Sequence, residues 1–251
     1  MRILITNDDG IYSPGIAALA QVASRFGETR IVAPDVEMSS ASHSMSSNRP
    51  LSYKTTRLPV PVEGVQAFRV NGTPADCVTL GCSLWDKVDI VLSGINIGMN
   101  LGNAVWHSGT LAGAKQATLL GLRGIAFSAP ATETEQPDFE ALKPWVSTVL
   151  ESLLEVPELK LVNVNFPARA PRGTVWACQS VRHYDGKVVA AKDPAGRPIY
   201  WYTVVPIEGA EDASDLRAVQ QGFVSMTPLR LDLTDHEQLA RAKSLEQIRF
   251  A

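Results

Sequence analysis

Short apolar runs alternate with stretches of helical character over the first two thirds of the chain. The apolar runs have the length of buried strands and occur at residues 3–6, 30–34, 65–70, 88–94, 124–128 and 160–165. The stretches between them predict helices at residues 15–26, 74–85, 111–120 and 139–154. Strands that alternate with helices indicate an α/β fold with a largely parallel sheet covered by helices.

The pattern changes after residue 166. Two extended stretches separated by turn formers predict a β-hairpin, at residues 175–189 and 199–204. Tyr200, Trp201 and Tyr202 suit an arm that contacts another subunit, although an ordinary edge hairpin is the alternative. The remaining predicted elements are two helices and the strand between them, at residues 215–221, 237–248 and 223–226.

Length and composition favour a single domain. A chain of 251 residues with 45% hydrophobic content can bury a full core. We expect an α/β catalytic core at residues 1–166. We expect residues 167–251 to form a hairpin arm and a C-terminal segment that complete the domain and support oligomerisation.

The charge balance argues against general binding to polyanions. With 23 basic and 26 acidic residues the net charge is -3, so we expect no nucleic acid polymer and no membrane as a partner. The three cysteines include no Cys-x-x-Cys pair, so a disulfide framework is not indicated. No apolar run has membrane-spanning length and no signal peptide precedes the first strand, which favours a cytoplasmic protein.

Two adjacent carboxylates, Asp8 and Asp9, follow the first predicted strand. Ligands of α/β proteins bind beyond the carboxyl ends of the strands, where these side chains are expected. Neighbouring carboxylates repel each other and no lysine or arginine lies nearby in sequence, so a hard divalent cation is their natural partner. An equally good interpretation is that one of them caps the following helix.

Loops after other predicted strands offer further oxygen ligands and an anion site. Ser39 lies in a polar loop at residues 35–48, and Asn96 in a loop of glycines and asparagines at residues 95–103. With the two aspartates they would form a low-charge oxygen site for Mg²⁺ or Mn²⁺, although each alone is a common turn former. The N-terminus of the helix after residues 108–110 is a candidate anion site.

These groups favour phosphoryl chemistry. A bound divalent ion lowers the pKa of a coordinated water, and backbone donors at a helix N-terminus stabilise phosphoryl oxygens. Asp8 could instead be attacked to form a phosphoaspartate, but such enzymes carry Asp-x-Asp, and the adjacent aspartates favour attack by metal-bound water. His43 and His107 lie in the candidate loops and could donate to phosphate, or could be ordinary polar loop residues.

The motifs that signal other chemistries are missing from the sequence. The chain lacks Gly-x-Ser-x-Gly, the phosphate loop Gly-x-x-x-x-Gly-Lys-Ser/Thr and the spaced glycines of dinucleotide folds. The motifs that are present follow one order, at residues 3–10, 33–35 with Ser39, 71–78, 93–98 with Asn100, 108–110 and 222–229. In this order they resemble the SurE family, the stationary-phase survival proteins that act as 5′/3′-nucleotidases, over nearly the whole chain.

The resemblance implies a Rossmann-like three-layer sandwich with a mainly parallel sheet, a protruding β-hairpin and a C-terminal tail, in homodimers or homotetramers. It implies metal-dependent removal of phosphate from nucleoside 5′- and 3′-monophosphates, with some action on short polyphosphate. By position, one Mg²⁺ or Mn²⁺ per subunit would be held by Asp8, Asp9, Ser39 and Asn96. The residues near the phosphate would be Asn7, Asn96, Ser108, Gly109 and Thr110.

The chain departs from the family pattern at two positions. Ser40 stands where the family usually has glycine, and His107 where it usually has tyrosine. Neither change removes an expected ligand. The alternatives to a nucleotidase are a non-catalytic nucleotide-binding regulatory protein and a phosphosugar transferase that uses the same fold.

Overall fold

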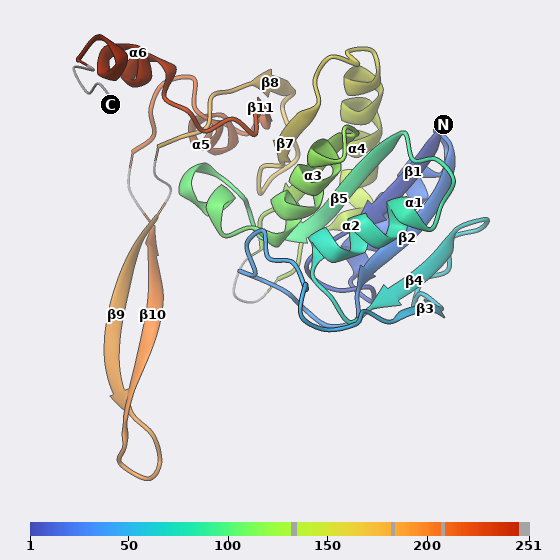
Figure 1. Cartoon of the computed structure of the whole chain (residues 1–251), viewed down its shortest axis with the longest axis horizontal. Helices are drawn as coiled ribbons and strands as arrows, with labels where there is room; N and C mark the ends of the chain where they lie inside the picture. Colours follow the sequence, from blue (N-terminus) through green and yellow to red (C-terminus); the bar gives the residue numbers. More distant parts are fainter. Residues whose placement is uncertain (132–134, 182–183, 207–208, 246–251) are drawn as a thin grey trace, which may run out of the picture.

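Nine of the described strands form one mixed sheet, whose central strands run parallel (Figure 1). The computed structural model describes residues 1–131, 135–181, 184–206 and 209–245. In spatial order the sheet comprises β3 (Tyr53–Thr56), β4 (Gln66–Val70), β2 (Glu28–Pro34), β1 (Arg2–Thr6), β5 (Ile90–Ile97), β6 (Arg123–Ala129), β7 (Leu161–Asn165), β11 (Val224–Pro228) and β8 (Thr174–Trp176). Pairing is parallel from β4 through to β7, whereas β3 and β11 run antiparallel to β4 and β7.

Helices cover both faces of this sheet. The described helices are α1 (Pro14–Ala23), α2 (Pro74–Ser83), α3 (Gly109–Leu119), α4 (Phe139–Leu154), α5 (Asp215–Gln220) and α6 (His236–Leu245), with a 3₁₀ helix, η1, at Gly102–Trp106. Ile3 and Ile5 pack in one apolar cluster with α1 and α4, and Leu4 packs in another with α2. All three side chains are fully buried, which explains why β1 reads as a continuous apolar run. The predicted three-layer α/β sandwich is confirmed.

A two-stranded ribbon projects away from the sheet (Figure 1). It consists of β9 (Tyr184–Lys192) and β10 (Pro198–Pro206), paired antiparallel. The side chains of Tyr200, Trp201 and Tyr202 are 68%, 61% and 67% exposed. Because neighbouring residues of a strand point to opposite faces, the ribbon presents aromatic side chains on both of its faces. The predicted protruding hairpin is therefore present.

The prediction of a single extended stretch at residues 175–189 is wrong. Its first part is β8, which pairs in parallel with β11 in the main sheet, and its last part is β9 in the ribbon. Strand periodicity is the same in both settings, so a local pattern could not separate them. The short strand β3 was missed because it is an exposed edge strand, anchored where the ring of Tyr53 stacks on Phe68 with centroids 4.5 Å apart.

Two further boundaries differ from the sequence interpretation. Strand β5 continues to Ile97, into the loop predicted at residues 95–103, because Ile97 pairs with Ala129 of β6. The end of the same loop winds into η1.

The predicted helix at residues 237–248 is observed as α6, and residues 246–248 lie outside the described part of the chain. No helix within the described ranges is long and apolar enough to cross a membrane.

Helix α3 packs unusually close to β6. A Cβ added to Gly124 would lie 2.0 Å from the carbonyl oxygen of Ala114, so only glycine fits at this position. We expect Gly124→Ala to lower the free energy of unfolding by about 2 kcal/mol or more, because backbone atoms must move apart. Denaturant titration measures the change.

Lys54→Ala on the exposed edge strand β3 is the matched control. We expect it to change the unfolding free energy by less than about 0.5 kcal/mol. Equal stability of the Gly124→Ala variant and the wild type would contradict the close packing of α3 on β6.

Candidate active site

The candidate site begins where β1 ends and the chain turns. The side-chain amide nitrogen of Asn7 donates to the backbone carbonyl oxygen of Gly10 over 2.9 Å, which closes the turn. Gly10 has φ +91°, a conformation that other residues rarely adopt, and an added Cβ would make a tight contact of 3.3 Å with the backbone of Val36. This turn places Asp8 and Asp9 at the carboxyl-end rim of the parallel strands.

Asp8 lies against the N-terminus of α3. Its side chain is buried, and its Oδ1 accepts a hydrogen bond of 2.5 Å from the hydroxyl of Thr110. A Cβ on Gly109 would lie 2.7 Å from the Cβ of Asp8, so glycine permits this close approach. Burial raises the pKa of Asp8, and hydrogen bonds from Thr110 and from the backbone of Gly109 oppose the rise.

Asp9 is held by the neighbouring strand. Its Oδ2 accepts a hydrogen bond of 3.1 Å from the backbone N–H of Ile97. Burial, the charge of Asp8 and the charge of Glu37 raise the pKa of Asp9 to about 7, and the bond from Ile97 opposes the rise. Neither aspartate forms an ion pair with any residue in the described part of the chain.

The two other predicted ligands lie next to residues that contact the aspartates. Met38, which precedes Ser39, donates its backbone N–H to the carbonyl oxygen of Asp8 over 2.7 Å. Ser39 is exposed and its hydroxyl donates to Glu37 over 2.7 Å. Asn96 precedes Ile97 and donates its amide nitrogen to the carbonyl of Gly98 over 2.8 Å, which leaves its amide oxygen able to act as a ligand.

The predicted phosphate contacts at residues 108–110 form the start of α3. Ser108 is the N-cap, and its hydroxyl accepts the backbone N–H of Leu111 over 3.0 Å. Gly109 and Thr110 direct donors at Asp8. The helix N-terminus therefore faces a carboxylate of the same chain, beside the position at which the sequence predicts a phosphate.

A buried amide network behind Thr110 was missed by the sequence interpretation. Asn100 donates its side-chain nitrogen to the hydroxyl of Ser128 over 2.8 Å and contacts that of Thr110 at 3.4 Å. The side-chain oxygen of Asn165 accepts a hydrogen bond from the backbone N–H of Asn100, and the side-chain nitrogen of Asn163 donates to the backbone carbonyl of Asn100. The alternation Asn-Val-Asn at residues 163–165, in a predicted core strand, could have indicated this network, because buried side-chain amides require hydrogen-bond partners.

The two candidate histidines have different settings. His43 Nε2 lies 2.9 Å from the side-chain oxygen of Gln116 on α3, which anchors the loop after β2. His107 is exposed, and its carbonyl accepts the backbone N–H of Ser42 over 3.0 Å. Ser40, the departure from glycine, has φ +60°, a conformation that glycine adopts at lower cost.

The donor set fits a hard divalent cation. Two buried or half-buried carboxylates lie together without a positive partner among the described residues, and the side-chain oxygen of Asn7 beside them is buried with no hydrogen bond. No group of three His, Cys, Asp or Glu side chains that could hold a metal occurs in the described chain, so the remaining ligands here would have to be neutral oxygens. A site here would combine two carboxylates with neutral oxygens, which suits Mg²⁺ or Mn²⁺ better than zinc.

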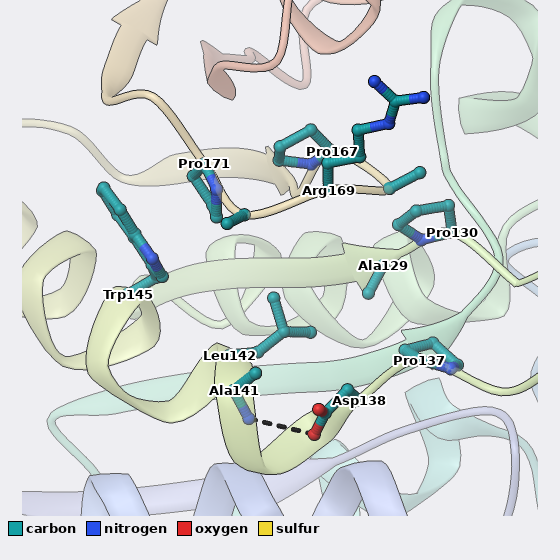
Figure 2. A pocket seen from close by; sticks show the side chains of 12 residues that line it. Ala129, Pro130, Pro137, Asp138, Ala141, Leu142, Trp145, Pro167, Arg169 and Pro171 are labelled. Carbon is teal, nitrogen blue, oxygen red and sulfur yellow. Dashed lines mark hydrogen bonds between the residues drawn. The ribbon is translucent and has the colours of Figure 1, made fainter.

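Two cavities flank this rim. One, of about 530 Å³, is lined by Asp9, Tyr12, Ser39 and Ile97 among others. The other, of about 270 Å³, lies between the start of α4 and the segment after β7 (Figure 2). Its Asp138 caps α4 by accepting the N–H of Ala141 over 3.1 Å, and the guanidinium of Arg169 points away from the other labelled side chains. The second cavity therefore offers little chemistry.

Comparisons with known proteins find relatives over nearly the whole chain. A family model described as "Survival protein SurE" matches residues 3–186. The chain is 44% identical to 5′-nucleotidase SurE 1 of Thermus thermophilus over 238 residues, 94% of each chain. It is 42% identical to 5′-nucleotidase SurE of Deinococcus radiodurans, over 93% of this chain and 88% of that one. The crystal structure of the SurE protein from Aquifex aeolicus superposes with a TM-score of 0.82 at 37% identity and covers 98% of this chain and 100% of that one.

The raised pKa of Asp9 makes stability dependent on pH. With a folded pKa of about 7 against an ordinary 3.8, the native protein keeps a proton that the unfolded chain releases, so in EDTA stability falls as pH rises from about 4 to about 7. We expect Asp9→Asn, which can still accept the N–H of Ile97, to raise the Tm at pH 8 and to match the wild type near pH 4. Thermal unfolding measured across this pH range tests the prediction. If the Tm of the two proteins changed with pH in parallel, the pKa of Asp9 would not be raised in the folded protein.

Proposed function

The chain belongs to the SurE family of survival proteins, and on this premise we propose that it is a nucleotidase that releases phosphate from nucleoside monophosphates. The observation that carries the proposal is the pair of adjacent carboxylates with no cationic partner among the described residues, set against a helix N-terminus. The family membership supports hydrolysis of a nucleotide. Action on 3′- as well as 5′-monophosphates, and on short polyphosphate, is part of the same proposal.

We propose that Asp8, Asp9, Ser39 and Asn96 hold one Mg²⁺ or Mn²⁺ per subunit. When bound, such an ion lowers the pKa of water and polarises a phosphoryl oxygen. The chain supplies the positioning: Thr110 holds the carboxylate of Asp8, and the backbone of Ile97 holds that of Asp9. Because these carboxylates are fixed before any ligand arrives, little reorganisation is needed on binding.

We assign the phosphate to the space beside the start of α3. Asn7, Asn96 and residues 108–110 are the groups proposed to contact it. The amide network around Asn100 keeps the hydroxyl of Thr110 in place. Through this hydroxyl, the network positions the carboxylate of Asp8. A regulatory protein that binds nucleotide without turnover would have little use for two carboxylates buried at such cost, which favours the enzyme.

Phosphate release from AMP tests the proposal. We expect release with Mn²⁺ or Mg²⁺, none in EDTA, and a fall in kcat/KM of about 10³ or more for Asp8→Asn and Asp9→Asn, since each removes a charge on which cation binding depends. Release of free phosphate without an acceptor would exclude a phosphosugar transferase.

Asp138→Asn is the matched control, because asparagine also caps a helix and the residue lies in the other cavity (Figure 2). We expect it to keep wild-type activity. Calorimetric titration with Mn²⁺ alone provides a second readout, in which the Asp8 and Asp9 variants bind at least tenfold more weakly. Full activity in either variant would disprove the metal assignment.

We also propose that the β9–β10 ribbon mediates a homodimer or homotetramer. Three consecutive aromatic side chains are more than 60% exposed on it, and aromatic residues are enriched at subunit interfaces. We expect the wild type to sediment as a dimer or tetramer and Trp201→Glu to dissociate it, whereas Lys187→Glu on the partner strand has little effect. A monomeric wild type would refute this role.

A further inference from the structure

The loop that carries Asn100 packs on helix α5. Leu101, the next residue of this loop, is fully buried and lies in one apolar cluster with Leu216 of the helix. Gly102 follows, and its backbone N–H donates a hydrogen bond of 3.2 Å to Oδ2 of Asp215, the first residue of α5. The loop therefore takes its position from a segment that lies 113 residues later in the chain.

The carboxylate of Asp215 is fully buried and forms no ion pair with any residue in the described ranges. Its Oδ1 accepts hydrogen bonds from the backbone N–H and the hydroxyl of Ser180, over 3.0 and 2.6 Å, and from the backbone N–H of Leu216 over 2.8 Å. Its Oδ2 accepts the bond from Gly102. These donors stabilise the buried carboxylate and hold it in a single orientation.

Helix capping does not account for this side chain. The N-cap of α5 is Ser214, whose hydroxyl accepts the backbone N–H three residues further on, over 3.2 Å. Among the donors to the carboxylate of Asp215, only the N–H of Leu216 belongs to α5, and the others belong to Ser180 and Gly102. The carboxylate therefore joins α5 to the segment after β8 and to the loop after β5.

A series of buried contacts leads from this loop to the carboxylate of Asp8. Asn100 directs its side-chain nitrogen at the hydroxyl of Ser128 over 2.8 Å and at that of Thr110 over 3.4 Å. Thr110 in turn donates its hydroxyl to Oδ1 of Asp8 over 2.5 Å. All of these side chains are buried, so a shift of the loop would be transmitted along the series, because close-packed groups cannot move independently.

We propose that Asp215 is a positioning residue for the reaction. By holding the N–H of Gly102 it keeps Asn100 and Thr110 in place, and through them the carboxylate of Asp8. The proposal rests on the nucleotidase function and adds to it a residue that lies outside the proposed metal and phosphate contacts.

Asp215→Asn tests the proposal by breaking one contact. The amide oxygen of asparagine can still accept from Ser180 and Leu216, whereas its amide nitrogen would face the N–H of Gly102, and two donors cannot pair. With AMP at saturating Mn²⁺ we expect kcat to fall about tenfold and KM to change by less than about threefold, because a misplaced Asp8 affects the chemical step more than substrate binding.

Ser214→Ala is the matched control. It removes the N-cap of α5 and so lowers the Tm, but it leaves the carboxylate of Asp215 and its donors in place. We expect its kcat and KM to stay within about twofold of the wild type. If Ser214→Ala lowered kcat as much as Asp215→Asn does, loss of stability would explain both effects and the proposal would be overturned.

A double-mutant cycle follows the effect to Asp8. Thr110→Val removes the hydroxyl through which Asp215 is proposed to act. In the Thr110→Val background we therefore expect Asp215→Asn to lower kcat by less than about twofold. A further tenfold fall in that background would mean that the two residues act independently, which contradicts the proposed route.

Hydrogen exchange tests the contact itself without turnover. We expect the backbone N–H of Gly102 to exchange at least about tenfold faster in Asp215→Asn than in the wild type, and that of Ile5 in β1 to exchange at the same rate in both. Equal exchange rates at Gly102 would overturn the proposal. Failure of the nucleotidase function would appear separately, as no phosphate release from AMP by the wild type.

Discussion

The local structure depends on keeping two carboxylates close together where water is scarce. Asp8 is buried and Asp9 is half-buried, and the charge of Asp8 raises the cost of ionising Asp9. Burying charge without a partner is among the most expensive arrangements in a protein. The fold tolerates it because hydrogen bonds from Thr110 and Ile97 offset part of the cost. The uncompensated remainder is the cost that the proposed cation would offset.

Rigid elements hold this arrangement from behind. Asp8 meets α3 across a contact that only Gly109 permits, and α3 meets β6 across a contact that only Gly124 permits. Asn100 links the same helix to β6 and β7 through buried hydrogen bonds. Since each contact is close packed, a shift of α3 would be transmitted to the carboxylate of Asp8.

The two sides of Asp9 have different chemical character. Toward α3 lie backbone and hydroxyl donors, which suit an anion, and toward β2 lies a cavity with acidic walls and the ring of Tyr12. A nucleoside monophosphate has the same division into an anionic end and a neutral end. This asymmetry supports the proposed function.

The sequence by itself determined the α/β order of the core, the position of Asp8 and Asp9 at a strand end and the family, because these depend on local periodicity and on contiguous motifs. Only the tertiary structure decided that β8 joins β11 rather than the ribbon, that α3 points its donors at Asp8, and that Asn100 supports Thr110. These features arise from contacts between residues far apart in the chain, and no local pattern encodes such contacts.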